Sequence, residues 1–211
     1  MQEQLFSHHF HQTIQLDNGA LDYFPNWLPE NLAWSYFNYL QKFCVWQQST
    51  IQLAGRSVKI PRLNAWYGDA DAYYRYSGTD FSPLRWNHAL LALRRRLEKH
   101  FSQNNLPGFN SALINYYRDG NDSVSWHADD EPELGPSPVI ASLSFGATRR
   151  FLLKPKRGGD SLKLDLEHGS LLIMQPPLQK NWLHCLPKTK RLINSRINVT
   201  FRQVVVRNNR N

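Results

Sequence analysis

The sequence predicts a mainly β fold, a sandwich or barrel with helices packed on its outside. Two observations predict it: from residue 111 onward short apolar runs alternate with turn residues, and two amphipathic helical stripes lie earlier in the chain. A chain of 211 residues can bury one full core, and it contains no internal repeat or low-complexity linker. We therefore expect a single domain.

Two helices are predicted before residue 111. After Pro29 the apolar residues advance by four, three and four positions, which places them on one helix face. They are Ala33, Phe37, Leu40 and Cys44. A second stripe comprises Leu90, Leu93, Leu97 and Phe101. The opposite face of that helix is interpreted as solvated, and it carries Arg94, Arg95, Arg96 and Lys99.

Most of the predicted strands follow residue 111. Between the two helices, residues 51–60 (IQLAGRSVKI) predict a hairpin that turns at Gly55, and residues 61–78 are rich in aromatics. Further on, turn signals such as DGND, KRGGD and HG separate the runs. The runs are SALINYY, SVSWH, PVIASLSFG, RRFLLK, SLKLDL and GSLLIM.

The charge balance favours a polyanionic partner. Lysine and arginine number 25 against 17 acidic residues, a formal net charge of +8, and nucleic acid is the leading candidate. No stretch approaches the roughly 20 apolar residues of a membrane-spanning helix, and the N-terminus lacks a secretion signal. We expect no membrane association and a cytoplasmic protein, or a nuclear one in a eukaryote. Cys44 and Cys185 are far apart and are interpreted as buried, inert thiols.

His127 and Asp129 stand two residues apart in VSWHADDE, residues 124–131. In an extended backbone alternate side chains share a face, so the pair could chelate a metal or could be two solvated residues at a strand end. Metal chemistry needs a third ligand, and His184 in NWLHCLP is the best downstream candidate. Two histidines and one carboxylate form the facial triad of non-haem iron(II) oxygenases, which leaves coordination positions open. A hydrolytic zinc site and a structural histidine are the alternatives.

Residues 196–202, RINVTFR, alternate polar and apolar side chains. In a half-exposed strand the polar face would meet water. In a barrel wall both faces would be enclosed, and buried arginines would then need an anionic partner such as a carboxylate. Arg196 and Arg202 together would suit a small dianion, for which a redox-inert zinc site gives no reason.

These motifs together resemble the AlkB family of iron(II)- and 2-oxoglutarate-dependent dioxygenases, in its nucleic-acid repair branch. The resemblance covers about residues 50–203 and extends through PRLNAWYGDADAYYRYSG, LINYYRDGND and IASLSFGATRRF. It implies a double-stranded β-helix, or jelly roll, over residues 111–204. It also implies a nucleotide-recognition lid with a helix over residues 51–110 and an N-terminal extension with a helix over residues 1–50.

The resemblance further implies a cofactor and cosubstrates, which are Fe(II), 2-oxoglutarate and O2. The iron ligands and catalytic centre would be His127, Asp129 and His184. Arg202 would contact the carboxylate of 2-oxoglutarate that chelates the metal, and Arg196 would pair with the distal carboxylate. The further hydrogen-bond partners of the cosubstrate would be Asn115, Tyr117 and Asn198.

A damaged base must leave its stack to be processed, and the resemblance implies how it would be held. Tyr76 would stack on the base opposite His127, while Tyr74 and Ser77 would line the mouth. Glu131 would contact an exocyclic amine of the alkylated base.

Clustered cations near the site are predicted to bind the nucleic-acid backbone. They are Arg56, Lys59 and Arg62 near the lid, with Lys154, Lys156 and Arg157 on a later hairpin. Asp130 is predicted to support the site by pairing with Arg149 or Arg150.

The function implied is oxidative demethylation of 1-methyladenine and 3-methylcytosine in DNA, with release of formaldehyde, succinate and CO2. Ala54 and Gly55 stand where duplex-repair relatives can carry a bulky wedge, so single-stranded DNA is the favoured substrate, although Leu53 or Arg56 could take that role. We expect a monomer. Three alternatives stay open: the same chemistry on RNA, the same chemistry on lipid or protein, and a non-enzymatic basic nucleic-acid-binding module.

Overall fold

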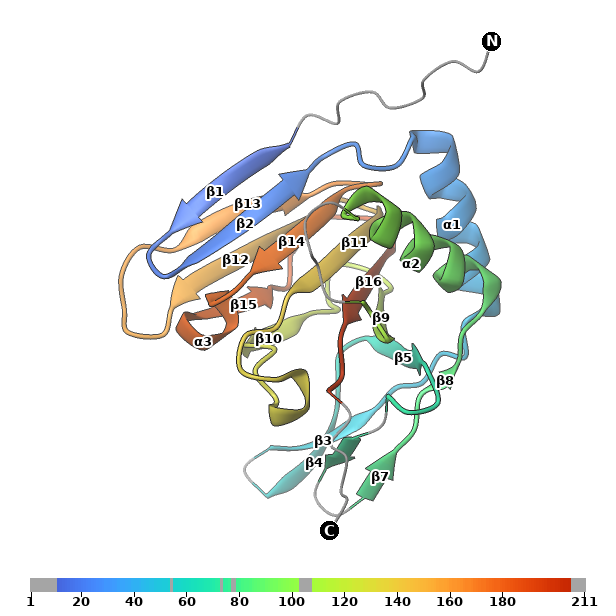
Figure 1. Cartoon of the computed structure of the whole chain (residues 1–211), viewed down its shortest axis with the longest axis horizontal. Helices are drawn as coiled ribbons and strands as arrows, with labels where there is room; N and C mark the ends of the chain where they lie inside the picture. The colour runs from blue at the N-terminus through green and yellow to red at the C-terminus, as the bar shows by residue number, and fades with distance from the viewer. Residues whose placement is uncertain (1–10, 54, 73, 77–78, 103–107, 206–211) are drawn as a thin grey trace.

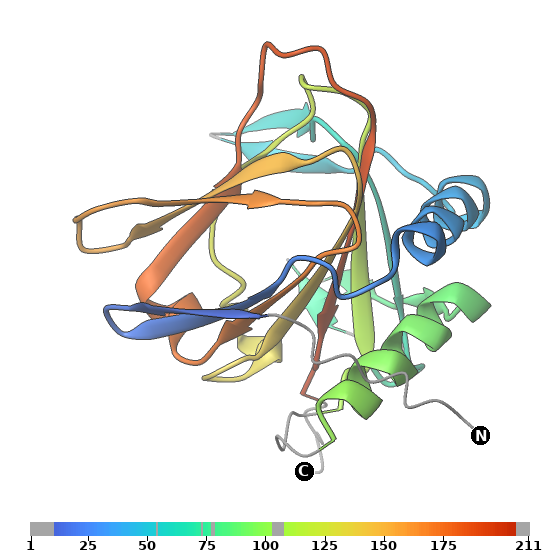
Figure 2. The same ribbon diagram turned by 90° about the horizontal axis from the view of Figure 1, so that it is seen from above.

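Two sheets of unequal size form the body of the protein, seen from two directions in Figures 1 and 2. This computed structural model describes residues 11–53, 55–72, 74–76, 79–102 and 108–205, apart from the side chains of residues 53, 74–76 and 79–81. The large sheet has eight strands in the order β1-β2-β14-β11-β16-β9-β5-β8. They are β1 (Gln12–Leu16), β2 (Gly19–Phe24), β14 (Leu171–Gln175), β11 (Ile140–Gly146), β16 (Arg196–Arg202), β9 (Ser111–Tyr117), β5 (Leu63–Gly68) and β8 (Leu84–Arg85).

The small sheet has four strands in the order β10-β15-β12-β13 and packs against the large one. They are β10 (Val124–His127), β15 (Trp182–Leu186), β12 (Arg149–Pro155) and β13 (Leu162–Leu166). Outside the sandwich lie two hairpins, β3 (Thr50–Leu53) with β4 (Arg56–Lys59) and β6 (Tyr74–Tyr76) with β7 (Thr79–Phe81). The helices are α1 (Glu30–Phe43), α2 (His88–His100), α3 (Leu178–Asn181) and the 3-10 turn η1 (Pro132–Leu134). The predicted mainly β architecture with flanking helices is confirmed.

Strand β16 is enclosed on both faces. Ile197, Val199 and Phe201 are each 0 % exposed and pack into the core that the large sheet shares with α1 and α2. The alternate side chains point between the two sheets, where Arg196 is 1 % exposed. Of the two environments considered for RINVTFR, the enclosed barrel wall is therefore confirmed.

Helices α1 and α2 cover the face of the large sheet that is turned away from the small sheet (Figure 2). Their predicted apolar stripes are buried, from Ala33, Phe37 and Leu40 in α1 to Leu90, Leu93 and Leu97 in α2. Helix α2 begins after Asn87, whose side chain accepts a hydrogen bond from the Leu90 backbone and caps the first turn. Among the described residues, no helix is long and apolar enough to cross a membrane.

The first 50 residues contribute more than the predicted extension with a helix. Strand β2 pairs antiparallel with β14 in the register Met174 to Leu21, so this segment completes the large sheet. Leu21 is fully buried between the sheets, in a second core with Phe151, Leu153 and Trp182 of the small sheet. The segment is too short and irregular in pattern for its strands to be evident without their partners.

The two hairpins lie together at one end of the sandwich, at the bottom of Figure 1. The hairpin predicted over residues 51–60 is confirmed, because β3 and β4 pair from Thr50 with Lys59 to Leu53 with Arg56. Gly55 at its turn has a φ of +76°, a conformation that a residue with a Cβ rarely adopts.

We expect Phe201→Ala to destabilise the protein by about 3–5 kcal/mol, because a fully buried aromatic ring would be replaced by a cavity. Leu192→Ala is the matched control, since Leu192 is 104 % exposed and its truncation should leave stability nearly unchanged. Urea unfolding followed by tryptophan fluorescence measures both. Equal unfolding midpoints would contradict the assignment of β16 to the core.

We expect His168 to make the stability of the protein depend on pH. Its Nδ1 accepts a 2.8 Å hydrogen bond from the Gly146 backbone N–H, and the Trp34 ring stacks on it at 4.2 Å. Burial lowers the pKa of His168 below its ordinary value. Below about pH 6.5 the unfolded chain therefore binds a proton that the folded chain resists, and stability falls as the pH falls.

We expect the wild-type protein to lose more stability than His168→Gln between pH 7.5 and pH 5, because the variant lacks this titration. Urea unfolding of both proteins at each pH measures the difference. Parallel pH profiles of the two proteins would show that His168 does not carry the effect.

Candidate metal and cosubstrate site

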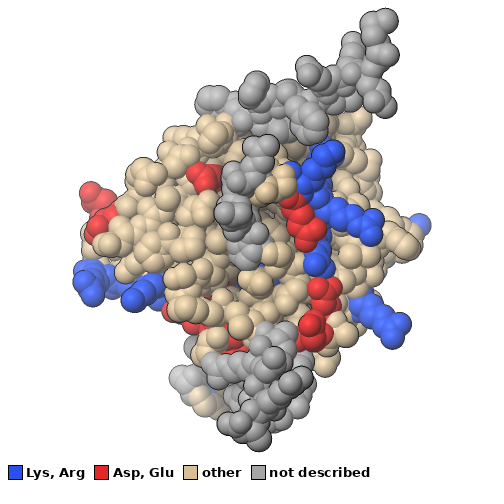
Figure 3. Space-filling view, viewed as in Figure 1, with Lys and Arg blue, Asp and Glu red and all other residues tan. Residues whose placement is uncertain are grey.

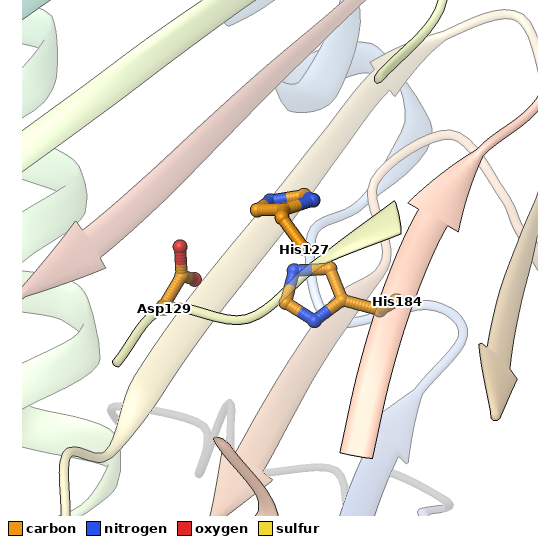
Figure 4. A group of neighbouring side chains, drawn as sticks. All are labelled: His127, Asp129 and His184. Carbon is orange, nitrogen blue, oxygen red and sulfur yellow. The ribbon is translucent and has the colours of Figure 1, made fainter. Parts of the chain in front are cut away.

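Three potential metal ligands converge between the sheets, as Figure 4 shows. His127 is the last residue of β10, Asp129 lies in the bend two residues later, and His184 is in the middle of β15. The pairing of β10 with β15 sets His127 directly opposite His184. Each of the three residues offers one ligand atom, and these atoms all lie within 4.8 Å of one another. Sheet register therefore brings together the two histidines that the sequence separates by 57 positions.

The protonation states of this cluster suit a divalent metal. Burial, with the nearby His127, lowers the pKa of His184 to about 3, so its imidazole is neutral at pH 7. Burial alone would raise the pKa of Asp129, but Arg202 and the two histidines outweigh it and hold that pKa below its ordinary value. Ser125 O lies 2.9 Å from Nδ1 of His127, which leaves Nε2 of that ring available as a ligand atom.

The donor set is two imidazoles and one carboxylate, which fits iron(II) and leaves other coordination positions open. Arg202 supports it, because its Nη2 donates to Oδ1 of Asp129 at 2.5 Å. Asp129 is also fixed through its backbone N–H, which donates to the Gln179 side chain at 2.9 Å. The carboxylate is therefore oriented before any metal binds.

Arg196 is a buried charge without an anionic partner among the described residues. Its Nη2 donates to Ser144 Oγ at 2.9 Å, while Nε and Nη1 have no hydrogen-bond partner. Burial lowers the pKa of Arg196 to about 10, so the guanidinium still carries its charge at pH 7. The Nε of Arg202 is buried and unpaired as well. Such groups are costly to leave unpaired, and both side chains line one cavity of about 210 Å³ together with the three metal ligands.

The other predicted cosubstrate contacts line the same cavity. Strands β9 and β16 are neighbours, in a register that sets Asn198 opposite Asn115 and Arg196 opposite Tyr117. Asn198 donates from Nδ2 to Ser142 Oγ and to the Leu143 carbonyl. The guanidinium of Arg196 lies 5.3 Å from the centre of the Tyr117 ring.

Comparison with known proteins agrees with this geometry. The family model described as the 2OG-Fe(II) oxygenase superfamily matches residues 20–202. The chain is 41 % identical to alpha-ketoglutarate-dependent dioxygenase alkB homolog 3 of Bos taurus, over 85 % of this chain and 64 % of the relative. It is 38 % identical to DNA oxidative demethylase ALKBH2 of Arabidopsis thaliana, over 92 % of this chain and 69 % of the relative.

The chain belongs to the AlkB family of 2OG-Fe(II) oxygenases. The solved structure of OsALKBH1 has the same fold, with a TM-score of 0.61 over 91 % of this chain and 100 % of that one, at 18 % identity. The predicted family and the jelly-roll fold are confirmed. AlkB membership implies Fe(II), 2-oxoglutarate and O2, and the triad and the unpaired arginines fit the first two. The chain spans 64 % of the length of the Bos taurus relative and 52 % of that of alkB homolog 3 of Mus musculus.

Two predictions about this AlkB site are wrong in detail. Arg62 does not join a surface group of phosphate ligands, because its side chain points inward, donates to Asn115 and lines the cavity. Asp130 pairs with Lys156 at 2.8 Å rather than with an arginine of β12.

The two arginines that were predicted to pair with Asp130 contact other residues instead. Arg150 forms an ion pair with Asp165, the residue directly opposite it on β13. Arg149 is 3 % exposed and donates to the backbone carbonyls of Asp119, Asp122 and Pro187. The alternation of side chains along β12 separates them, since Arg149 points inward and Arg150 outward.

The predicted substrate contacts are only partly described. Ser77 and the side chains of Tyr74 and Tyr76 lie outside the described residues. Glu131 is an exposed residue that lines the same cavity as the triad, and partial desolvation of its carboxyl raises its pKa against the attraction of Arg202. Figure 3 shows lysine and arginine side chains at the tip of the hairpin between β12 and β13, where Lys156 and Arg157 lie, and over α2.

Sequence reasoning missed the serines that support the cosubstrate pocket. Ser142 and Ser144 of β11 accept hydrogen bonds from Asn198 and Arg196, respectively. Their signal was present, because IASLSFG alternates small polar and apolar residues in the same way as RINVTFR.

We expect His184→Ala to abolish tight divalent metal binding, because a buried ligand is lost from a three-residue site. His88→Ala, which changes an exposed histidine at the start of α2, is the matched control and should bind metal normally. Visible absorption during anaerobic titration with Co(II) measures the occupancy of each variant. Equal binding by His184→Ala would remove this residue from the metal site.

Proposed function

We propose that the protein oxidatively demethylates N-alkylated bases in nucleic acid, using Fe(II), 2-oxoglutarate and O2 and releasing formaldehyde, succinate and CO2. The observation that carries the proposal is the cavity itself, in which a triad of two histidines and one carboxylate lies beside two buried arginines with unpaired N–H groups. Relatives named as DNA oxidative demethylases support the choice of substrate.

In this proposal His127, Asp129 and His184 hold the iron and form the catalytic centre. Iron held there would supply the oxidation of the methyl carbon, with O2 as oxidant and 2-oxoglutarate converted to succinate and CO2, and the resulting hydroxymethyl group would leave as formaldehyde. Arg196 pairs with the distal carboxylate of 2-oxoglutarate, and Arg202 holds the Asp129 carboxylate and the near carboxylate. Asn115, Tyr117 and Asn198 complete the cosubstrate pocket.

The alkylated base enters at the side of the cavity where Glu131 lies. Methylation of N1 of adenine or N3 of cytosine gives the ring a positive charge, which a nearby carboxylate favours over the neutral base. Tyr74, Tyr76 and Ser77 of the lid form the remaining walls in this proposal, with Tyr76 stacked on the base.

In this proposal cations of β4 and of the β12–β13 hairpin hold the nucleic-acid backbone. Arg56 and Lys59 are exposed on β4, Lys154 is half-buried near the end of β12, and Lys156 and Arg157 are exposed just after that strand. Lys156 also neutralises Asp130 near the opening, which reduces repulsion of phosphates. The turn of the β3–β4 hairpin carries Gly55, with nothing within 4 Å of a Cβ built there.

Single-stranded DNA is the substrate that we propose, because Gly55 at the hairpin turn has no side chain to replace an extruded base. RNA is the alternative, since exposed cations bind the phosphates of RNA as well as those of DNA. We further propose that the protein acts as a monomer in the compartment that holds its nucleic acid, the cytoplasm or a nucleus.

The test is anaerobic loading with Fe(II) and 2-oxoglutarate, followed by air and a single-stranded oligonucleotide carrying one 1-methyladenine. We expect the oligonucleotide to lose one methyl group, with one formaldehyde released, and His127→Ala to do neither. Product mass and formaldehyde are measured on DNA, its RNA counterpart and the DNA duplex, and the single strand should react about tenfold faster than the duplex.

Each possible result tests a different part of the proposal. Succinate production without demethylation of any oligonucleotide would retain the iron chemistry and reject the substrate. Absence of both products would favour a non-enzymatic binding module. A duplex that reacts faster than the single strand would reject the single-strand preference alone.

A further inference from the structure

Arg62 occupies a junction between the β3–β4 hairpin and the body of the protein. It lies between the end of β4 and the start of β5, and the backbone on both sides of it is fixed. Ile60 N donates to Ser49 O at 2.9 Å and closes the root of the hairpin. Ser123 N donates to Pro61 O at 2.9 Å, which ties the same root to the segment that leads into β10. These contacts hold the backbone from which the Arg62 side chain extends.

The Arg62 side chain points from this junction into the cavity of the metal ligands. Its Nε donates to Oδ1 of Asn115 at 2.8 Å, and its Nη1 donates to the Ser123 carbonyl at 3.2 Å. Among the described residues, no carboxylate forms an ion pair with it. The hydrogen bonds of this guanidinium go to neutral acceptors, so they fix its direction without forming an ion pair.

The contact decides which way the Asn115 amide faces. A guanidinium has only donors, so the oxygen of the amide must face Arg62 and the Nδ2 group must face away from it. Asn115 lines the cavity, and among the described residues nothing accepts a hydrogen bond from Nδ2. The free end of the amide is therefore a donor, which suits a carboxylate or keto oxygen. Without Arg62 the amide could turn and present its oxygen, which would repel an anion.

We propose that Arg62 is a positioning residue that fixes the Asn115 amide with its N–H toward 2-oxoglutarate and so joins the root of the β3–β4 hairpin to the cosubstrate pocket. This inference rests on the proposed function, in which Asn115 contacts the cosubstrate. Through Arg62 and Asn115, the hairpin that carries the exposed Arg56 and Lys59 is connected to the cosubstrate pocket.

The experiment is a double-mutant cycle on 2-oxoglutarate affinity, measured by calorimetry with Mn(II) in place of iron so that no turnover occurs. Arg62→Met keeps the length and apolar stem of the side chain but removes its donors, and we expect about a tenfold loss of affinity. Asn115→Ala should cause a similar loss. The double variant should bind no more weakly than Asn115→Ala alone, because Arg62 acts through Asn115.

Two further variants distinguish a positioning role of Arg62 from a nonspecific loss of 2-oxoglutarate affinity. Arg95→Met removes the same type of side chain from the exposed face of α2 and should leave 2-oxoglutarate affinity unchanged. Arg62→Lys retains one donor for Asn115 and should bind with an affinity between those of the wild type and Arg62→Met. Urea unfolding of every variant confirms that the protein measured is folded, and Arg62→Lys replaces Arg62→Met in the cycle if the latter does not fold.

The outcomes distinguish this inference from the proposed function. If the wild-type protein with Mn(II) binds no 2-oxoglutarate, the proposed function fails and this inference fails with it. If the wild type binds but the Arg62 variant binds equally well, only the role of Arg62 is rejected. Losses that add in the double variant would also reject it, because Arg62 would then act independently of Asn115.

Discussion

The guanidinium of Arg196 is 1 % exposed and has two unpaired N–H donors, and this uncompensated charge constrains the structure around it. Moving a charge out of water is costly unless an anion or a set of acceptors replaces the water. Among the described residues, the guanidinium of Arg196 contacts Ser144 and the face of the Tyr117 ring, and both of these groups are neutral. Folding RINVTFR into the large sheet therefore turns an unpaired cation toward the cavity, where a carboxylate ligand is favoured.

The alternation of side chains along β16 connects the metal and cosubstrate site to the core. Odd-numbered side chains of β16 anchor the helical layer, so the even-numbered ones are held rigidly between the sheets. Arg202 at the end of the strand reaches Asp129, and the pairing of β10 with β15 places the two histidines beside that carboxylate. The metal ligands and the cosubstrate ligands thus belong to one network of charges. In this network Arg202 forms an ion pair with Asp129, whereas Arg196 has no anionic partner among the described residues.

The N-terminal segment adds to the core of the sandwich, whereas the hairpins lie outside it. Strand β2 completes the large sheet beside β14 and adds Leu21 to the core between the sheets. The β3–β4 hairpin stands outside that core, and its described side chains are exposed on β4. Its root is nevertheless bonded to the segment before β10 through Pro61 and to β9 through Arg62, so the hairpin nearest the proposed nucleic-acid path is also connected to the cosubstrate pocket.

The sequence by itself determined the helices, the hairpin at Gly55, most strands after residue 111 and the residue types of the triad. These features depend on local periodicity and on side-chain chemistry, which a single chain displays directly. Tertiary structure decided the burial of both faces of β16, the inclusion of β1 and β2 in the large sheet, and the partners of Asp130 and Arg62. Those depend on which segments meet in space: Lys156 reaches Asp130 across 26 positions and Arg62 reaches Asn115 across 53. No local pattern encodes such distant pairings, because a charged side chain reads the same in sequence whether it faces water or a cavity.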